Sequence, residues 1–300
     1  MISQPELLAN KQATLELEKI LSPPPVIDFT AASKKLLQAR ARQLVLSITM
    51  LNEYLKDSSH FVEKYLLLAP DYDVSPALTF GNCLHRTLEQ SFRPVISGQS
   101  PLSPSAASAL FAQLFNEQDH EPDHQKHLQE GQVSLQVYLQ QYEQSPRQVL
   151  AVEKKLGAPS PLLLDDIPLT GKIDRIDQIA PGEALVIDYK TGKHHSHNHL
   201  LGKTADANLS ERERQLPECL RSQYKRQLLF YKLLCQLDPQ FHDTVSSGSL
   251  EFVKLENNKP SIQNFLLPDE EVEQLKVLIR QVWSEIQALD FLSPAATSSQ

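Results

Sequence analysis

The stretch GKIDRIDQIAPGEALVIDYKTGK, residues 171–193, contains two runs of Ile, Val and Leu that each carry acidic residues. Ala180-Pro181-Gly182 separates the runs, and there Pro fixes φ while Gly can adopt a positive φ. The pattern predicts a β-hairpin of two antiparallel strands, residues 171–179 and 183–190. Its charged groups fall within a sheet that should be buried, so they require a partner or a function.

The register of this hairpin decides how its acids lie. If Ile179 pairs with Glu183, then Asp174 lies directly opposite Asp188. Directly opposed side chains have Cβ atoms about 4.5–5.5 Å apart, close enough for two carboxylates to share one divalent cation. Without a cation this pairing destabilises the sheet. Lys190 follows Asp188 by two residues and therefore lies on the same face of the strand.

Two carboxylates beside an ammonium group favour one kind of chemistry. Oxygen ligands suit Mg²⁺ or Mn²⁺, which lower the pKa of a bound water and neutralise charge on a phosphate. Lys190 can orient that water or stabilise the developing charge. Phosphodiester hydrolysis is the reaction that these groups serve best. The structural alternative is a surface hairpin whose acids pair with Lys172, Arg175 and Lys190.

The composition is that of a globular protein. Of the 300 residues, 41% are hydrophobic, enough for the core of one large or two small domains. The three cysteines lack paired spacing and favour a reduced, cytoplasmic setting, and no apolar segment predicts a signal peptide or membrane span. The net charge of −8 argues against general attraction to nucleic acid. Residues 170–232, however, carry eleven Lys and Arg against eight Asp and Glu, which permits a local basic channel.

Hydrophobic periodicity predicts a mixed α/β fold. Residues 1–29 form an N-terminal helix that ends at a Pro-rich linker, and residues 30–300 form the main domain. Its helical part is expected at about 47–145 and its α/β core at about 147–290. The expected elements include helices at 79–92, 109–115, 124–142, 223–237 and 270–289 and a strand at 248–255.

Several ordered motifs resemble those of the PD-(D/E)XK nuclease superfamily, specifically its RecB-like branch. They are LSITMLNEYL from Leu46, GNCLH at 81–85, AVEKKL at 151–156, GKIDRID at 171–177, VIDYKTGK at 186–193 and QLLFY at 227–231. The resemblance spans residue 44 to about residue 255. It implies a restriction-endonuclease-like core, a small mixed β-sheet flanked by helices, with an inserted helical segment.

The resemblance also implies roles for individual residues. Asp174 and Asp188 match the family's metal carboxylates, and Lys190 matches its catalytic lysine. His85, in the G-x-x-x-H motif, matches a histidine ligand carried on a helix. The backbone carbonyl of Tyr189 matches a further metal ligand.

Other residues match supporting positions. Glu153 matches an acid that often lies near the metals, although it can equally be an exposed strand charge. Gln227 and Tyr231 lie four residues apart on one helix face and match a Q-x-x-x-Y motif thought to position the substrate backbone. The alternative for the tyrosine is a core residue with a hydrated hydroxyl. Lys193 and Arg175 are also expected to bind substrate.

The implied cofactor is Mg²⁺ or Mn²⁺. No iron–sulfur cluster is expected, because Lys56-Asp57-Ser58-Ser59 stands where many relatives have Cys-Pro and no cysteine cluster follows downstream. No ATP site is expected either, because GKT at 202–204 lacks the earlier glycine of a Walker A motif. The HHSHNH run at 194–199 is interpreted as a solvated or DNA-facing loop.

The function implied is that of a metal-dependent deoxyribonuclease. The resemblance indicates an exonuclease of DNA repair or recombination that acts on single- or double-stranded DNA. The domain resembles one appended to UvrD-type helicases, so the chain is expected to be either a free-standing version of that domain or one that works with a separate helicase subunit. Two alternatives stay open. One is a catalytically inactive nucleic-acid-binding or scaffold module of a helicase–nuclease complex, and the other is hydrolysis of another phosphoester such as RNA.

Overall fold

A computed structural model describes residues 31–69, 76–118 and 123–289. Contacts within the backbone divide the chain into two compact units, residues 1–37 and 38–300. In the first unit, the described residues 31–37 form the beginning of helix α2 (Ala31–Ala41). The helix and linker predicted for residues 1–29 lie outside the described residues.

A five-stranded sheet forms the centre of the second unit. Its order is β1–β4–β5–β6–β7, and neighbours are antiparallel except β5 and β6, which are parallel. The strands are β1 (Gln148–Leu156), β4 (Gly171–Ala180), β5 (Glu183–Lys190), β6 (Thr244–Glu256) and β7 (Lys259–Leu266). A separate two-stranded sheet contains β2 (Leu162–Leu164) and β3 (Ile167–Leu169). This mixed sheet confirms the predicted α/β class.

The predicted hairpin is present, but its turn differs from the prediction. Ala180, and not Ile179, pairs with Glu183, so the predicted pairing at the turn is wrong by one residue. The turn itself uses Gly182 at a φ of 79°, a conformation that glycine adopts without steric cost. An irregularity in the pairing between Gln178 and Ala180 then restores the expected register along the rest of the hairpin.

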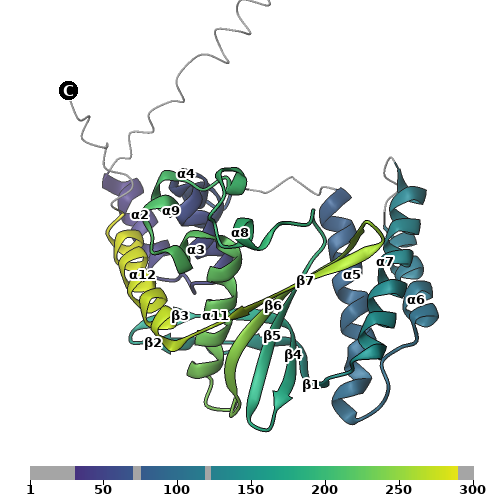
Figure 1. Cartoon of the computed structure of the whole chain (residues 1–300). Coiled ribbons are helices and arrows are strands. Elements are labelled where there is room, and N and C mark those ends of the chain that lie inside the picture. The colour runs from purple at the N-terminus through teal and green to yellow at the C-terminus, as the bar shows by residue number, and fades with distance from the viewer. Residues whose placement is uncertain (1–30, 70–75, 119–122, 290–300) are drawn as a thin grey trace, which may run out of the picture. The chain divides into compact units, whose positions relative to one another are not determined.

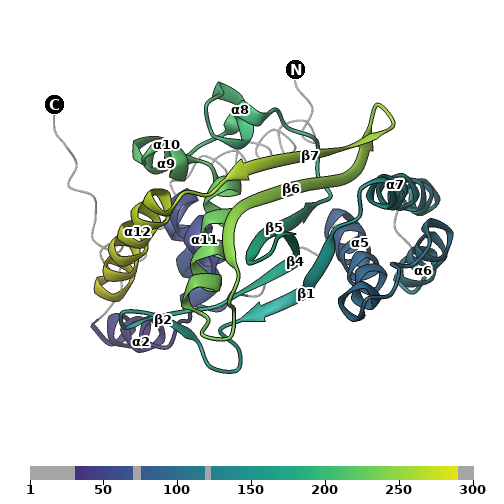
Figure 2. The ribbon, with the colours of Figure 1, turned by 60° about the horizontal axis from the view of Figure 1, so that its bottom comes forward.

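One group of helices packs on the sheet through α11 (Gln223–Leu237) (Figures 1 and 2). This helix contacts β4, β5 and β6, and α12 (Asp269–Ala288) and α3 (Ile48–Lys56) pack against it in turn. The approach is close, because a Cβ atom on Gly171 would lie 2.5 Å from Leu234 Cδ1. Glycine at the start of the G-x-x-D motif therefore allows α11 to contact β4.

A second group of helices lies at the other side of the sheet in Figure 2. It contains α5 (Pro76–Phe92), α6 (Pro104–Asn116) and α7 (His124–Gln144). Their buried aromatic and aliphatic side chains form one cluster with those of the strands: Phe80, Phe92, Phe111, Phe115, Tyr138, Val149, Leu185, Ile187 and Tyr189. Helix α6 begins at Pro104, earlier than predicted, because Ser103 caps it through a bond from the Ala106 amide.

Short helices complete the described chain. They are α4 (Ser58–Phe61), a π-helix (Val62–Leu66), two 3₁₀ helices (Arg93–Ser97 and Ala205–Ala207), α8 (His197–Leu200), α9 (Glu211–Gln215) and α10 (Glu218–Arg221). None of the helices in the described residues has the length and apolar character needed to cross a bilayer.

Candidate active site

Two buried acids face each other across the β4–β5 hairpin. Arg175 pairs with Ile187, so the next opposed positions along the two strands are Asp174 and Asp188. Their exposed fractions are only 6% and 4%. The backbone amide of Tyr189 donates to Asp174 Oδ2 at 2.8 Å, which fixes one oxygen of that carboxylate. The structure thus brings together the pair of acids that the hairpin register predicted.

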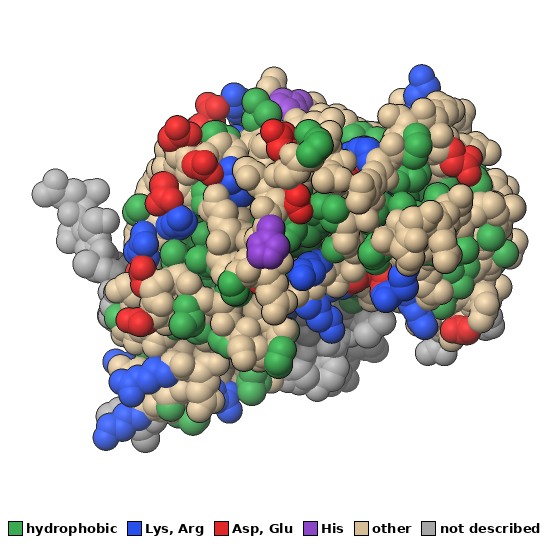
Figure 3. Space-filling view, turned by 90° about the horizontal axis from the view of Figure 1, so that it is seen from below, with side chains coloured by type: hydrophobic (Ala, Val, Ile, Leu, Met, Phe, Trp, Pro, Cys, Tyr) green, Lys and Arg blue, Asp and Glu red, His purple; other side chains and the backbone are tan. Residues whose placement is uncertain are grey.

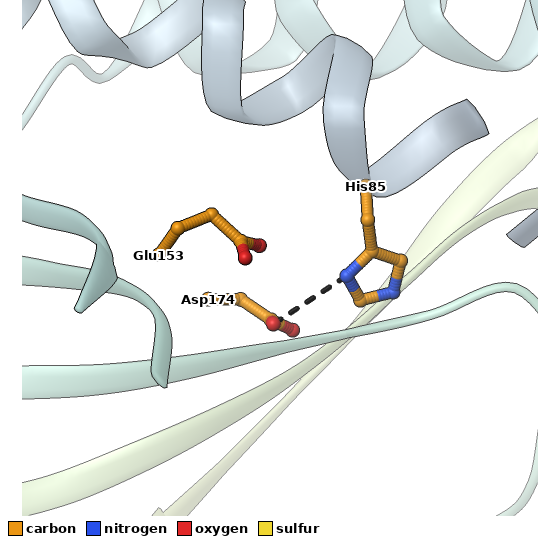
Figure 4. A group of neighbouring side chains, drawn as sticks. All are labelled: His85, Glu153 and Asp174. Carbon is orange, nitrogen blue, oxygen red and sulfur yellow. Dashed lines mark ion pairs between the residues drawn. The ribbon is translucent and has the colours of Figure 1, made fainter. Parts of the chain in front are cut away.

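A histidine and a third acid meet Asp174 from neighbouring elements (Figure 4). His85 projects from α5, and its Nδ1 lies 3.4 Å from Asp174 Oδ1. Glu153 lies on β1 between the two residues that pair with Ile173 and Arg175, which sets it opposite Asp174. Ligand atoms of His85, Glu153 and Asp174 all lie within 4.8 Å of one another. That separation suits a shared ion, since metal–ligand bonds are about 2.0–2.6 Å long.

The backbone at Glu153 has an unusual conformation for a strand residue. Its φ is 48°, in the left-handed region that side chains other than glycine rarely adopt. Such a conformation costs about 1–3 kcal/mol and is concentrated at functional sites. The Glu153 carboxylate also pairs with Lys172, whose ammonium group neutralises it. Glu153 is therefore held at the acid cluster.

Asp188 is the centre of a second set of contacts. Its Oδ1 accepts hydrogen bonds from Gln227 Nε2 at 2.7 Å and from the Tyr231 hydroxyl at 3.0 Å. Its Oδ2 lies 2.7 Å from Lys190 Nζ. Lys190 in turn donates to Gln227 Oε1 at 2.9 Å, and Gln227 Nε2 also donates to the Tyr231 hydroxyl at 2.7 Å. Gln227 thus bridges the acid and the lysine.

The acids perturb one another and their neighbours. Burial raises the pKa of Asp188 above its usual value, with Lys190 opposing the rise and Asp174 adding to it. Burial lowers the pKa of His85, but the carboxylates of Asp174, Asp188 and Glu153 raise it by more, so that it lies above its ordinary value. The site therefore holds an excess of negative charge that a cation would relieve.

These groups line a cleft of about 770 Å³. One wall is the start of α3 with its N-cap residue, Ser47 to Thr49, and another is α5 from Ala77 to Glu89. The floor carries the acids, Lys190 and the two α11 residues Gln227 and Tyr231. A Cβ on Gly81 would lie 3.2 Å from Thr191 Oγ1, so glycine in the G-x-x-x-H motif lets α5 approach the end of β5.

Arg175 does not lie in this cleft. It follows Asp174 in the strand and therefore points to the opposite face, where only 1% of it is exposed. There it bonds to Asp177 and to the hydroxyls of Tyr138 and Tyr189. The expectation that Arg175 binds substrate conflicts with this burial and is not retained.

Lys193 and the histidine run lie in the loop and short helix after β5. Lys193 is exposed and is not among the residues that line the cleft. His194 Nε2 lies 2.6 Å from the carbonyl of Lys254, and the rings of His195 and His199 stack with centroids 4.0 Å apart. The run expected as a solvated loop therefore packs partly on β6, and its end forms α8.

Three cleft residues escaped the sequence analysis. Lys172, which pairs with Glu153, was considered only as a surface partner for the hairpin acids. Asn82 lies three residues before His85 on α5, a helical spacing that would have shown the two to share a face. Arg86 lies four residues after Asn82, and both of them line the cleft. In Figure 3, another view of the surface, acidic and basic side chains are interspersed.

Comparison with models of protein families identifies a match. A family model described as the PD-(D/E)XK nuclease superfamily matches residues 45–296, which is most of the chain. No curated protein matches the chain.

Proposed function

Because the chain belongs to the PD-(D/E)XK nuclease superfamily, we propose that it is a divalent-metal-dependent deoxyribonuclease that hydrolyses phosphodiester bonds. One observation carries the proposal. His85, Glu153 and Asp174 converge within 4.8 Å, beside the Lys190–Asp188 pair, in the same cleft. Carboxylate oxygens are donors that suit Mg²⁺ or Mn²⁺, and His85 adds one imidazole nitrogen to them.

The ligand set proposed for the ion is His85, Asp174, Asp188 and the backbone carbonyl of Tyr189, with Glu153 in support. Asp188 is compatible with this role because a carboxylate has about four acceptor positions. Two of them are taken at Oδ1 and one at Oδ2 by the contacts described above. When bound, the ion would lower the pKa of a water and neutralise charge on the phosphate.

The remaining residues hold the reacting groups in place. Lys190 presents an ammonium group that can orient the attacking water and stabilise the charge that develops on the phosphate. Gln227 accepts from Lys190 and donates to Asp188, so it fixes the distance between the amine and the acid. Tyr231 supplies a second bond to Asp188 from a buried hydroxyl. Gln227 and Tyr231 are therefore positioning residues first, and any contact of theirs with the substrate backbone is secondary.

Tyr231→Phe tests this positioning role. Removal of the hydroxyl deletes one hydrogen bond to Asp188 Oδ1, and loss of such a supporting bond typically costs about 10–100-fold in metal affinity or activity. We expect that loss in metal-dependent cleavage, with DNA affinity unchanged. Tyr224→Phe is the matched control, since it removes a hydroxyl from the same helix and keeps the ring, whose centroid lies 5.4 Å from Lys190 Nζ. If the Tyr231→Phe protein bound DNA more weakly but cleaved the bound DNA at the wild-type rate, Tyr231 would instead be a substrate-binding residue.

The branch of the superfamily and the biological role are assigned from the motif resemblance. We propose a RecB-like exonuclease of DNA repair or recombination that acts with a helicase supplied by another chain. The order of the motifs, from GNCLH through GKIDRID and DYKTG to QLLFY, supports this branch. The substrate strand would be held by phosphate contacts, so its binding should weaken as salt increases.

End-labelled linear and circular DNA, each single- and double-stranded, tests the proposal. The purified protein should degrade linear DNA with Mg²⁺ or Mn²⁺ and leave it intact in EDTA. Mn²⁺ should also raise the melting temperature of the protein, because a ligand that binds only the folded state stabilises it. His85→Ala should reduce that rise. DNA binding without cleavage under any of these ions would instead identify an inactive nucleic-acid-binding module.

A further inference from the structure

Three residues of α5 form a row along one wall of the cleft. Leu78, Asn82 and Arg86 are four residues apart, so they lie on one face of the helix at intervals of about 6 Å. All three line the cleft. His85 projects from the same stretch of helix towards Asp174, so the row begins next to the candidate metal ligands and leads away from them.

Arg86 differs from the other basic residues of the cleft. Lys172 pairs with Glu153, and Lys190 pairs with Asp188. Arg86 is exposed and has no ion-pair partner among the residues that the structure describes. A guanidinium group offers five N–H donors in a planar fork that matches the oxygens of a phosphate. Arg86 is therefore free to bind an anion that enters the cleft.

The net charge of the cleft shows why a phosphate beyond the metal ion needs an unpaired basic residue. Its lining contains four acids, Glu89, Glu153, Asp174 and Asp188, against three bases, Arg86, Lys172 and Lys190, a formal sum of −1. A bound divalent cation changes this sum to +1, which favours one phosphate at the ion but leaves little attraction for its neighbours. Two of the bases are neutralised locally by acids. Arg86 is left to bind a phosphate beyond the ion.

Leu78, at the other end of the row, is an apolar side chain. Its exposed fraction is 50%. Ala77 and Ile48 also line the cleft. An exposed apolar side chain in a polar cleft suits the flat face of a base or a deoxyribose. Asn82, between Leu78 and Arg86, can donate to and accept from polar groups.

We infer that the Leu78–Asn82–Arg86 row is a binding surface for the nucleotides next to the scissile phosphate, with Arg86 on a neighbouring phosphate and Leu78 against a base or sugar. This inference rests on the proposed nuclease function, and it adds a substrate-binding surface to the metal and lysine site. A strand that is unpaired at this point fits best, because Leu78 can contact the flat face of a base only where that base is not stacked in a duplex.

Fluorescence anisotropy with a 5′-fluorescein-labelled oligothymidylate, in Ca²⁺ and with the probe verified as intact, tests the surface. Arg86→Ala should raise the Kd about tenfold and make the slope of log K against log salt shallower by about 0.7, the value for one single-strand phosphate contact. Arg86→Lys should restore most of the slope. Leu78→Ala should raise the Kd severalfold and leave the slope unchanged.

Arg214→Ala is the matched control, because Arg214 is exposed but does not line the cleft. It should bind the probe as the wild type does. An Arg86→Ala protein indistinguishable from this control overturns the inference, and if the wild type still cleaves DNA, the proposed function stands. A wild type that neither binds nor cleaves DNA overturns both.

Discussion

Replacement of Lys190 by methionine is expected to lower the rate of metal-dependent DNA cleavage by about 100- to 1,000-fold, the effect typical of removing one group that stabilises charge in a transition state. Lys190 Nζ lies 2.7 Å from Asp188 Oδ2, and the residue lines the cleft. Methionine retains an unbranched side chain of similar length, so the loss can be attributed to the charge and the donors.

Single-turnover cleavage with enzyme in excess measures this effect without a contribution from product release. Metal affinity, followed by the Mn²⁺-induced rise in melting temperature, should change far less than the rate, because Lys190 is not a proposed ligand. Lys276→Met is the control, since Lys276 pairs with Glu273 on the surface of α12. A Lys190→Met protein that cleaves DNA within threefold of the wild-type rate would remove Lys190 from the mechanism.

The hairpin and its acids could be predicted from the sequence because the signals are local. Two runs of Ile, Val and Leu separated by Ala180-Pro181-Gly182 identified β4 and β5. Two-residue periodicity then placed Asp188 and Lys190 on one face. The wrong pairing predicted at the turn did not affect the predicted position of the acids. An irregularity in the pairing at Ile179 leaves Asp174 opposite Asp188, as predicted. The motif resemblance then added His85, Glu153 and the α11 pair, which come from distant parts of the chain.

Other features depend on contacts that no local pattern encodes. Strand β7 (Lys259–Leu266) is polar and follows two asparagines at positive φ, Asn257 and Asn258, so its sequence resembles a loop. The left-handed conformation of Glu153 arises inside a strand that alternation alone would make regular. The partner of Gln227 was predicted to be the substrate, whereas its amide bonds to Asp188 and Lys190. Tertiary packing determines the pairing of β7, the backbone conformation of Glu153 and the partners of Gln227.

Arg175 shows the same limitation, because it was expected to bind substrate, whereas its position in β4 turns its side chain away from the cleft. In the folded protein the guanidinium Nε lies 2.9 Å from Asp177 Oδ1, and a terminal nitrogen lies 3.6 Å from Glu251 Oε2. Its other terminal nitrogen donates to the hydroxyls of Tyr138 and Tyr189 at 3.1 and 2.8 Å. Arg175 and Asp177 of the GKIDRID motif thus form a buried ionic network away from the candidate active site.

Arg175→Ala is therefore expected to lower the free energy of unfolding by about 3–5 kcal/mol, because it leaves the buried carboxylates of Asp177 and Glu251 without their main cation. Both acids are almost completely buried, at 0% and 1% exposed. Burial raises the pKa of Asp177 and Arg175 opposes that rise, so loss of the arginine should raise this pKa further. Urea denaturation followed by circular dichroism measures the change.

Arg147→Ala provides a matched control for this network. Arg147 approaches the same two acids, at 3.6 Å from Asp177 Oδ2 and 3.7 Å from Glu251 Oε1, but it is 30% exposed. Water can replace a cation at such a position, so its loss should cost no more than about 1 kcal/mol. If Arg175 instead bound the substrate, its removal would weaken DNA binding and leave the unfolding curve in place. If the Arg175→Ala and Arg147→Ala proteins had equal free energies of unfolding, the proposed contribution of the buried Arg175 to stability would be wrong.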